Sequence, residues 1–196
     1  MFSVIGRAGV RAIDSALQRY YRVFPFTDDP ACILKIALTV SAHDVVLREG
    51  VRVARGESVL ALHLWNERLP ALPHRGATLP WGIEFARRTR YSLRLLAVYL
   101  AREPRFDSVR ALHGEFGFLE INQLPEMRAL VEHLGFEFIA GDAPGWRVWT
   151  YAFWQNLFSW WLMWTFNPAS LDGKHFGEIA RGELWLSRAV LMNRFR

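Results

Sequence analysis

The sequence contains little cysteine and little lysine. Cys32 is the single cysteine among 196 residues, which excludes an intramolecular disulfide and favours a reducing compartment. Lysine occurs only as Lys35 and Lys174, so the formal net charge of +5 comes almost entirely from arginine. Positive charge of this kind favours acidic partners such as lipid headgroups, phosphates or nucleic acid.

Motifs that announce a reaction are also absent. The chain has no Walker loop, dinucleotide fingerprint, nucleophile elbow, zinc pair or His-Glu-x-x-His. It contains no recognised nucleic-acid-binding module, and its aromatic residues gather in an uncharged segment, whereas stacking platforms for single strands mix them with basic residues. We therefore do not expect a nucleic-acid partner.

The first 26 residues have no apolar run long enough for a secretory signal, because Arg7 and Arg11 interrupt it early. We therefore expect a cytoplasmic protein. The apolar positions of this segment fit one stripe of an amphipathic helix with arginines near its edges: Phe2, Ile5, Gly9, Ile13, Leu17 and Tyr20. Such a helix either packs on its own domain or binds a membrane surface.

Hydrophobic periodicity predicts an α+β core over residues 27–140. The sequence favours strands over 32–40, 45–47, 51–53 and 59–65 in meander order, then a helix over 81–103, a strand over 108–119, a helix over 124–134 and a final strand over 135–140. The expected architecture is one mixed or antiparallel sheet covered by helices within a single domain of 1–196. A content of 52% hydrophobic and 22% charged residues excludes both disorder and a multispanning membrane protein.

A tryptophan-rich segment follows the Gly141–Gly145 break and opens an extension over 146–196 that we expect to be helical. Val148–Phe166 has 19 residues without a charge, five of them tryptophan. A transmembrane helix, a helix packed on the sheet and an interfacial, lipid-cradling helix are the three interpretations. At helical spacing one face carries Gln155, Asn156 and Ser159, and the other carries Trp149, Phe153, Leu157, Trp160 and Trp164. We expect the amide face to be wet and the oily face to meet lipid, and we expect a last helix over 182–196.

Three residues are the candidates for proton transfer. His113 and Glu115 share one face of their strand, and His63 shares a face with Trp65, because side chains alternate with a period of two. If the two strands are neighbours, His63, His113 and Glu115 converge, and a histidine beside a carboxylate is an oriented general base. No short spacing fixes them as metal ligands, so we predict no metal site.

Candidates for substrate binding lie near the ends of these elements. Polar groups where a strand runs into a loop commonly contact ligands, which favours Asn66 and Glu67 beside Trp65. The alternative is that Asn66 closes a turn and Glu67 pairs with Arg68. A phosphate would be held by the arginine-rich helix flank that includes Arg90, and an acyl chain by Trp160 and Trp164.

The stretches "LHLWNERLP", "YRVFPFTDDPACILKIAL", "REGVRVARGESV" and "EHLGFEF" resemble the YkoP-like family of bacterial proteins over about 20–140. Members of this family are found joined to, or beside, polysaccharide deacetylases and glycosyltransferases. The resemblance implies a role in cell-envelope glycan or glycolipid metabolism, without an assigned reaction.

A second segment, "MRALVEHLGFEFI", is similar to the closing helix and strand of the acetyl-CoA-dependent N-acetyltransferase (GNAT) superfamily. That resemblance implies an acyl-CoA cofactor. The chain departs from the superfamily's pattern, because "GEFGFLEINQLPE" lacks the basic residue and the glycine spacing of the pyrophosphate loop. Coenzyme A is therefore a candidate cofactor without its usual loop.

Two hypotheses follow. In the first, the chain is a peripheral enzyme of the inner membrane face, acyltransferase-like, that acts on a lipid or a lipid-linked sugar. In the second, it is a non-catalytic accessory that docks a membrane enzyme or a partner chain through the same aromatic surface. A deep pocket beside His63 and Asn66 would favour the enzyme, and a filled sheet surface would favour the accessory.

Overall fold

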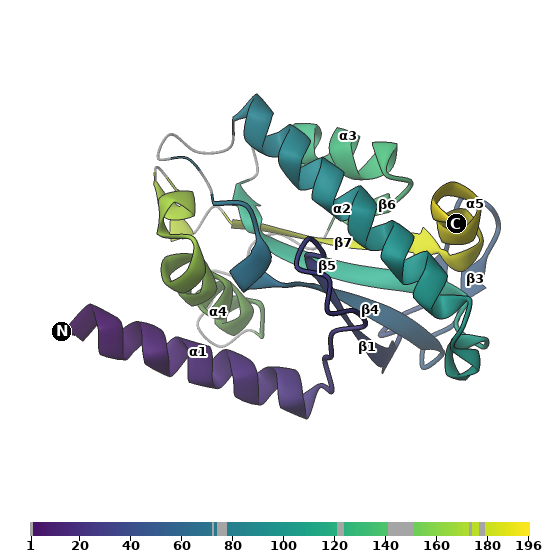
Figure 1. Ribbon diagram of the computed structural model, residues 1–196, viewed down its shortest axis with the longest axis horizontal. Coiled ribbons are helices and arrows are strands. Elements are labelled where there is room, and N and C mark those ends of the chain that lie inside the picture. The colour runs from purple at the N-terminus through teal and green to yellow at the C-terminus, as the bar shows by residue number, and fades with distance from the viewer. Residues whose placement is uncertain are drawn as a thin grey trace.

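The computed structural model describes residues 2–71, 73, 78–120, 124–140, 151–172, 174–176 and 179–196. The fold is α+β, as predicted, with one mixed sheet between two helical layers (Figure 1). The predicted break at 141–145 and the first residues of the tryptophan-rich segment, 146–150, lie outside the described residues.

The main sheet has five strands in the order β1-β4-β5-β7-β6. Their bounds are β1 (Leu34–Val40), β4 (Ser58–Leu64), β5 (Ala111–Glu120), β7 (Ile179–Ser187) and β6 (Glu137–Ala140). β4 and β5 are parallel, and every other neighbouring pair is antiparallel. The helix α2 (Leu79–Leu100) lies in the connection between the two parallel strands, as such a crossover requires.

The predicted four-strand meander is only partly correct. β1 and β4 are antiparallel neighbours, but β2 (Val45–Val46) and β3 (Arg52–Val53) form a separate two-stranded ribbon. Val45 and Val53 are buried against Trp185 on one face of the main sheet, so burial against that face, and not pairing with its edge, holds the ribbon.

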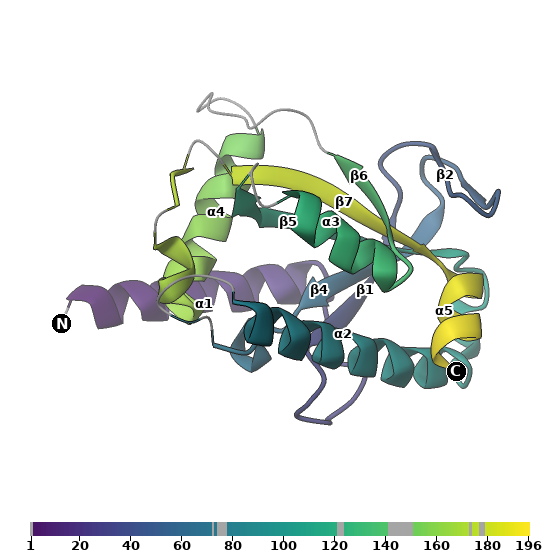
Figure 2. The same cartoon turned by 90° about the horizontal axis from the view of Figure 1, so that it is seen from above.

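Three helices cover the opposite face of the sheet (Figure 2): α2 (Leu79–Leu100), α3 (Leu124–His133) and α5 (Arg188–Phe195). Leu60 and Leu112 on the sheet meet Leu93, Leu96 and Leu191 on these helices, and all five are completely buried. This is an ordinary apolar core, which we call the dry face of the sheet.

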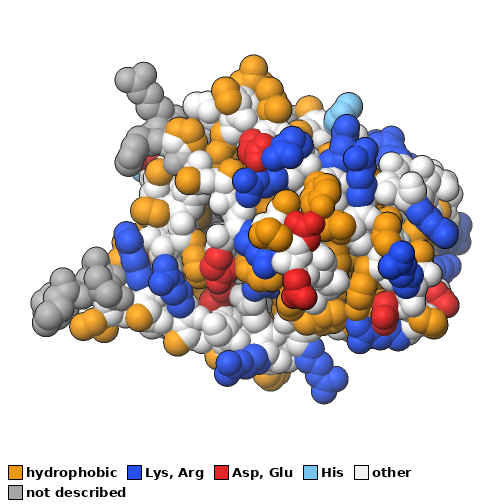
Figure 3. Space-filling view, in the orientation of Figure 1, with side chains coloured by type: hydrophobic (Ala, Val, Ile, Leu, Met, Phe, Trp, Pro, Cys, Tyr) orange, Lys and Arg blue, Asp and Glu red, His pale blue; other side chains and the backbone are white. Residues whose placement is uncertain are grey.

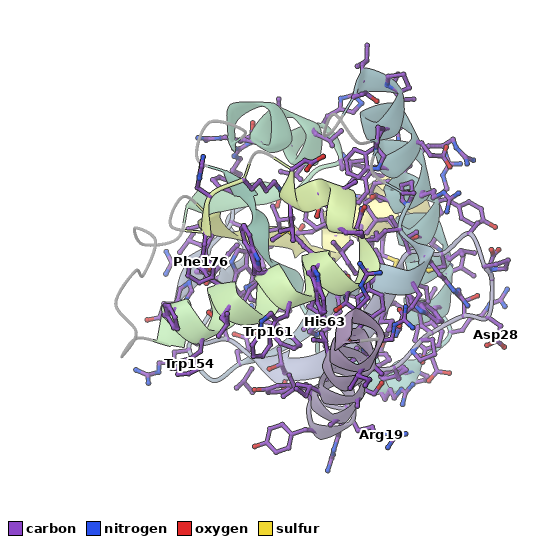
Figure 4. The ribbon with its side chains drawn as sticks, turned by 90° about the vertical axis from the view of Figure 1, so that its left-hand side faces the viewer. Arg19, Asp28, His63, Trp154, Trp161 and Phe176 are labelled. Atoms are coloured by element: carbon purple, nitrogen blue, oxygen red, sulfur yellow. The ribbon has the colours of Figure 1, made fainter. Side chains whose placement is uncertain are left out.

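The second face carries the β2-β3 ribbon and two further helices, α1 (Phe2–Tyr20) and α4 (Tyr151–Phe166). α1 lies along one side of the molecule and crosses α4 (Figures 1 and 4). Within the described part of the chain, no helix has the length and apolarity to cross a membrane.

The helix predicted over 182–196 is wrong in its first half. Residues 179–187 form β7, which lies between β5 and β6, and α5 begins only at Arg188. The Ser187 side chain caps α5 by accepting a hydrogen bond from the Val190 N–H at 3.1 Å. Leu184 and Leu186 face the dry side while Trp185 faces the other, an alternation typical of a strand.

Candidate interfacial site

The face of the sheet beneath α1 and α4 carries a line of ionisable side chains. Strand alternation directs the leucines of β4, β5 and β7 to the dry face and their polar neighbours to this one. We call this line the polar row: Lys35, His63, His113, Glu115, Arg181 and Glu183. The pairing register places Lys35 opposite His63 and Glu115 opposite Glu183.

The structure brings the three candidates for proton transfer to the same face. β4 and β5 are adjacent and parallel with Ala61 opposite His113, so His63 and His113 lie on neighbouring strands of the row. Glu115 lies two residues further along β5, with its Oε2 at 3.7 Å from Nη2 of Arg181. Their catalytic roles stay predictions.

His63 is held in its neutral form by its surroundings. Burial lowers its pKa to about 4, and the positive charges of His113 and Lys35 act in the same direction. The His63 imidazole lies beside the buried Lys35 ammonium and has no carboxylate partner within the described ranges, so its neutral form is the one expected.

A carboxylate lies between two histidines in the next part of the row. Glu183 Oε2 accepts a hydrogen bond from Trp185 Nε1 at 2.8 Å and lies 3.3 Å from His43 Nε2. His113 Nε2 is 3.7 Å from the same oxygen and has no hydrogen-bond partner among the described residues. Burial lowers the pKa of His113, although Glu183 and Glu115 oppose that effect.

Chemically, this group of His43, His113 and Glu183 can pass a proton between an exposed and a covered imidazole, because His43 is about half exposed and His113 mostly covered. In the part of the chain that the structure describes, no group of three histidine, cysteine, aspartate or glutamate residues has the arrangement of a metal site.

α1 contacts the polar row through its polar flank. Lys35 Nζ donates to Gln18 Oε1 at 2.8 Å, and Gln18 Nε2 donates to Asp14 Oδ2, also at 2.8 Å. Burial raises the pKa of Asp14, and the charge of Glu67 adds to the rise. This chain of hydrogen bonds joins β1 to two successive turns of the helix.

α4 is attached in the same manner. Asn156 is 2% exposed, and its Oδ1 accepts a hydrogen bond from Arg181 Nη1 at 2.9 Å. The expectation that the amide face of the tryptophan-rich segment is wet is therefore wrong at Asn156, whereas Gln155 and Ser159 are partly exposed. The reason is the sheet surface beneath the helix. It carries Arg181, which binds the amide, whereas an apolar surface would have attracted the indoles.

The two helices consequently present apolar side chains to the solvent. On α1, Ile5 and Ile13 are 63% and 46% exposed, and on α4, Trp154 and Trp161 are 57% and 40% exposed. Figure 4 shows Trp154 and Trp161 along the outer edge of α4, with His63 near its crossing with α1. Figure 3 shows apolar side chains and arginines mixed along the edge where Figure 1 places α1. We call Ile5, Ile13, Trp154 and Trp161 the outer apolar surface.

A shallow groove of about 530 Å³ lies between the two helices and is continuous with the outer apolar surface. Its lining is Gly6, Gly9, Val10, Ile13, Trp160, Trp161 and Trp164. It therefore contains Trp160 and Trp164, the two indoles predicted to hold an acyl chain. Neither this groove nor a second hollow of about 700 Å³ beside α5 includes His63 or Asn66.

The remaining predicted residues lie in two places. Trp65 follows β4 and contacts two cationic side chains, with Lys35 Nζ 4.5 Å and the Arg68 guanidinium carbon 3.4 Å from its ring centroid. Asn66 and Glu67 begin a short 3₁₀ turn beside it. Arg68 donates to the Asp29 carbonyl oxygen at 2.6 Å, so the structure gives no support to the suggested pair with Glu67.

Arg90 does not join this site. It lies on α2, which covers the dry face of the sheet, and its Nη2 is 3.2 Å from His133 Nε2 on α3. The flank of α2 and the polar row are thus on opposite sides of the sheet, so the two cannot bind one small ligand together.

The sequence alone did not single out His43, Glu183, Arg181, Lys35 or Asp14 for this site. Glu183 and Arg181 lie on β7, which was partly assigned to a helix, and His43 lies on the loop before the ribbon. The available signal was the alternation of Arg181, Glu183 and Trp185 with Gly182, Leu184 and Leu186, which is a strand pattern with a polar side.

Fold and site together define a small α+β protein whose two cover helices enclose a polar row and expose an apolar surface. The chain belongs to the YkoP domain family, whose model matches residues 7–195. The match confirms the family resemblance and extends it beyond 20–140 to both cover helices and β7. No curated protein and no solved structure matches the chain.

Proposed function

We propose that the chain is a peripheral protein that adsorbs to an anionic membrane surface through α1 and α4. One observation carries the proposal: both cover helices bury a polar side chain, Asp14 at 7% and Asn156 at 2% exposure, while Ile5, Ile13, Trp154 and Trp161 face outward. Fully burying a side chain of that size is favourable by about 1.5–3 kcal/mol, so water is an unfavourable neighbour for such a surface.

The charges around the surface suit an anionic bilayer. Arg7, Arg11, Arg19 and Arg22 all belong to α1 or its end, and arginines attract acidic headgroups while tryptophan prefers the water–lipid interface. The setting that we propose is cell-envelope glycan or glycolipid metabolism at the cytoplasmic side of the inner membrane, in accordance with the expectation from the family resemblance.

Vesicle flotation tests this function. We expect the intact chain to float with phosphatidylglycerol vesicles, to float less with phosphatidylcholine, and to be released by salt, because screening weakens exposed charge pairs. The double variant Ile13→Glu, Trp161→Glu should lose flotation. Ile83→Glu is the matched control, since Ile83 is 61% exposed but lies on α2, across the sheet.

Two results would overturn the proposal. One is a failure of the intact chain to float with anionic vesicles at low salt. The other is an equal loss of flotation in the Ile83→Glu control, which would show that any added negative charge prevents binding. Concentration-dependent dimerisation that disappears in the double variant, without flotation of the intact chain, would indicate the non-catalytic docking module instead.

An acid–base enzyme acting on a lipid or lipid-linked sugar is the second candidate. The favouring observation is that His113 Nε2 is covered, lacks a hydrogen-bond partner in the described part of the chain, and lies beside Glu183. Acyl-coenzyme A is the first donor to test. If the chain uses it, palmitoyl-CoA and free CoA both raise the melting temperature through binding to the folded state, and a lack of any shift with either excludes this donor.

A further inference from the structure

The groove between α1 and α4 has the properties of a site for one hydrocarbon chain. Its volume of about 530 Å³ lies within the usual range for small-molecule pockets, roughly 300–1,000 Å³. Val10, Ile13 and three indoles supply nearly all of its side-chain surface. A peptide in it would leave most of its backbone polar groups without partners, which is unfavourable, whereas a hydrocarbon has none to satisfy.

Two glycines of α1 shape the groove in different ways. A Cβ on Gly6 would lie 3.0 Å from Cη2 of Trp164, so the absence of a side chain lets the two helices approach. A Cβ on Gly9 would meet no heavy atom within 4 Å, so the lack of a side chain at this position leaves the groove open. Glycine inside a helix is about 0.5–1 kcal/mol less favourable than alanine. Close packing between the helices explains Gly6 but does not require a glycine at position 9.

Two arginines beside the groove have no carboxylate ion-pair partner among the described residues. The guanidinium carbon of Arg7 lies 5.3 Å from the Trp164 ring centroid, and that of Arg11 lies 5.6 Å from the Phe166 centroid. Arg7 Nε is covered and has no hydrogen-bond partner among the described residues. The described residues also supply neither guanidinium with an ion pair, so a positive charge next to an apolar groove is left for an external anion.

We infer that the groove holds one acyl chain of an anionic phospholipid, with the lipid phosphate bound by Arg7 and Arg11. The apolar lining selects the tail and the unpaired guanidinium groups select the charge of the head. This inference rests on the proposed function, because it gives the membrane-adsorbed protein a specific lipid contact in addition to its outer apolar surface.

Calorimetric titration with dihexanoyl phosphatidylglycerol, below its critical micelle concentration, tests the inference without a membrane. We expect the intact chain to bind this monomeric lipid and Gly9→Phe to weaken binding by at least about tenfold, because the new ring occupies the groove. Gly82→Phe is the control, since a Cβ at Gly82 on α2 also meets nothing within 4 Å. Gly82→Phe should bind as the wild type does.

A charge test follows with Arg7→Gln, Arg11→Gln. We expect this double variant to lose about tenfold in affinity for the phosphatidylglycerol and little for the matching phosphatidylcholine. Gly9→Leu replaces Gly9→Phe if circular dichroism shows that the larger side chain unfolds the protein.

The outcomes separate the two proposals. An intact chain that floats with anionic vesicles but binds no monomeric lipid overturns the acyl-chain site and leaves membrane adsorption standing. A chain that binds the monomer but does not float overturns the adsorption and leaves the site. Equal weakening by Gly9→Phe and Gly82→Phe, or a change of oligomeric state in Gly9→Phe alone, also overturns the site, the latter because the groove would then be an interface between copies.

Discussion

On one side of the sheet, Leu60, Leu96 and Leu112 pack among other apolar side chains. On the other side, Lys35 and His63 lie beneath a helix that turns Asp14 toward them and Ile13 away. The same strands supply both faces, since alternate side chains point in opposite directions. Helices on the dry face are held mainly by apolar burial, whereas α1 and α4 also depend on particular hydrogen bonds to the sheet and have apolar surface left for another partner.

The dry face should account for most of the stability, and its disruption is the largest effect that we predict. Leu96→Ala removes a completely buried side chain and should lower the free energy of unfolding by about 2–5 kcal/mol. Ile13→Ala, on the outer apolar surface, should change it by less than about 0.5 kcal/mol. Urea denaturation of both variants measures the difference, and similar losses would show that α1 is as firmly packed as the core.

The polar face should make stability depend on pH, with an effect of intermediate size. His63 binds a proton near pH 4 in the folded chain and near its ordinary pKa of about 6.5 when unfolded, so unfolding takes up a proton between these values. The contribution is therefore fully favourable to folding above about pH 6.5 and is lost as the pH falls toward 4. The loss should reach about 3 kcal/mol at most.

His63→Leu tests this origin, because leucine cannot be protonated. The variant should show a flatter decline in the free energy of unfolding between pH 6.5 and pH 4, measured by urea titrations at each pH. A decline parallel to that of the wild type would assign the effect to other groups of the polar row.

The sequence predicted the dry face well because apolar side chains follow the periods of helix and strand directly. The helix predicted over 81–103 is close to α2, and the strand over 59–65 is close to β4. β7 was missed because "GELWLSRAVL" also fits a helix when it is taken alone. Its strand form depends on pairing with β5 and β6, which no local pattern records.

Only part of the candidate site was predicted from the sequence, again because strand pairing leaves no local pattern. The period of two placed His113 and Glu115 on a common face, and the structure adds His63 through the pairing of β4 with β5. Glu183 and Arg181 were lost with β7. For α4, helical spacing placed Gln155, Asn156 and Ser159 on one face, but the burial of Asn156 depends on the sheet surface beneath the helix, where Arg181 lies. A one-dimensional pattern cannot show the polarity of a surface made by distant strands.

A smaller effect should come from the contact that attaches α1 to the polar row. In a double-mutant cycle of Lys35→Met and Gln18→Leu, we expect a coupling energy of about 1–2 kcal/mol, because a hydrogen bond to a charged group is stronger than a neutral one. Urea denaturation of the four proteins measures it. A coupling energy near zero would mean that α1 stays in place through its contacts with α4 alone.

The smallest effect on stability should come from the outer apolar surface itself, and its smallness is informative. Ile5→Ser with Trp154→Ser removes two large side chains, yet the free energy of unfolding should change by less than about 1 kcal/mol, because both side chains are more than half exposed in the folded chain. Binding of an apolar fluorescent dye should fall in this variant and persist in Ile83→Ser on α2. If the serine variant instead unfolds at a clearly lower urea concentration, these side chains act as core and the distinction between the two faces of the sheet fails. If stability is kept while dye binding falls, the apolar side chains of α1 and α4 contribute to an external contact and not to the fold, which is the property that membrane adsorption requires.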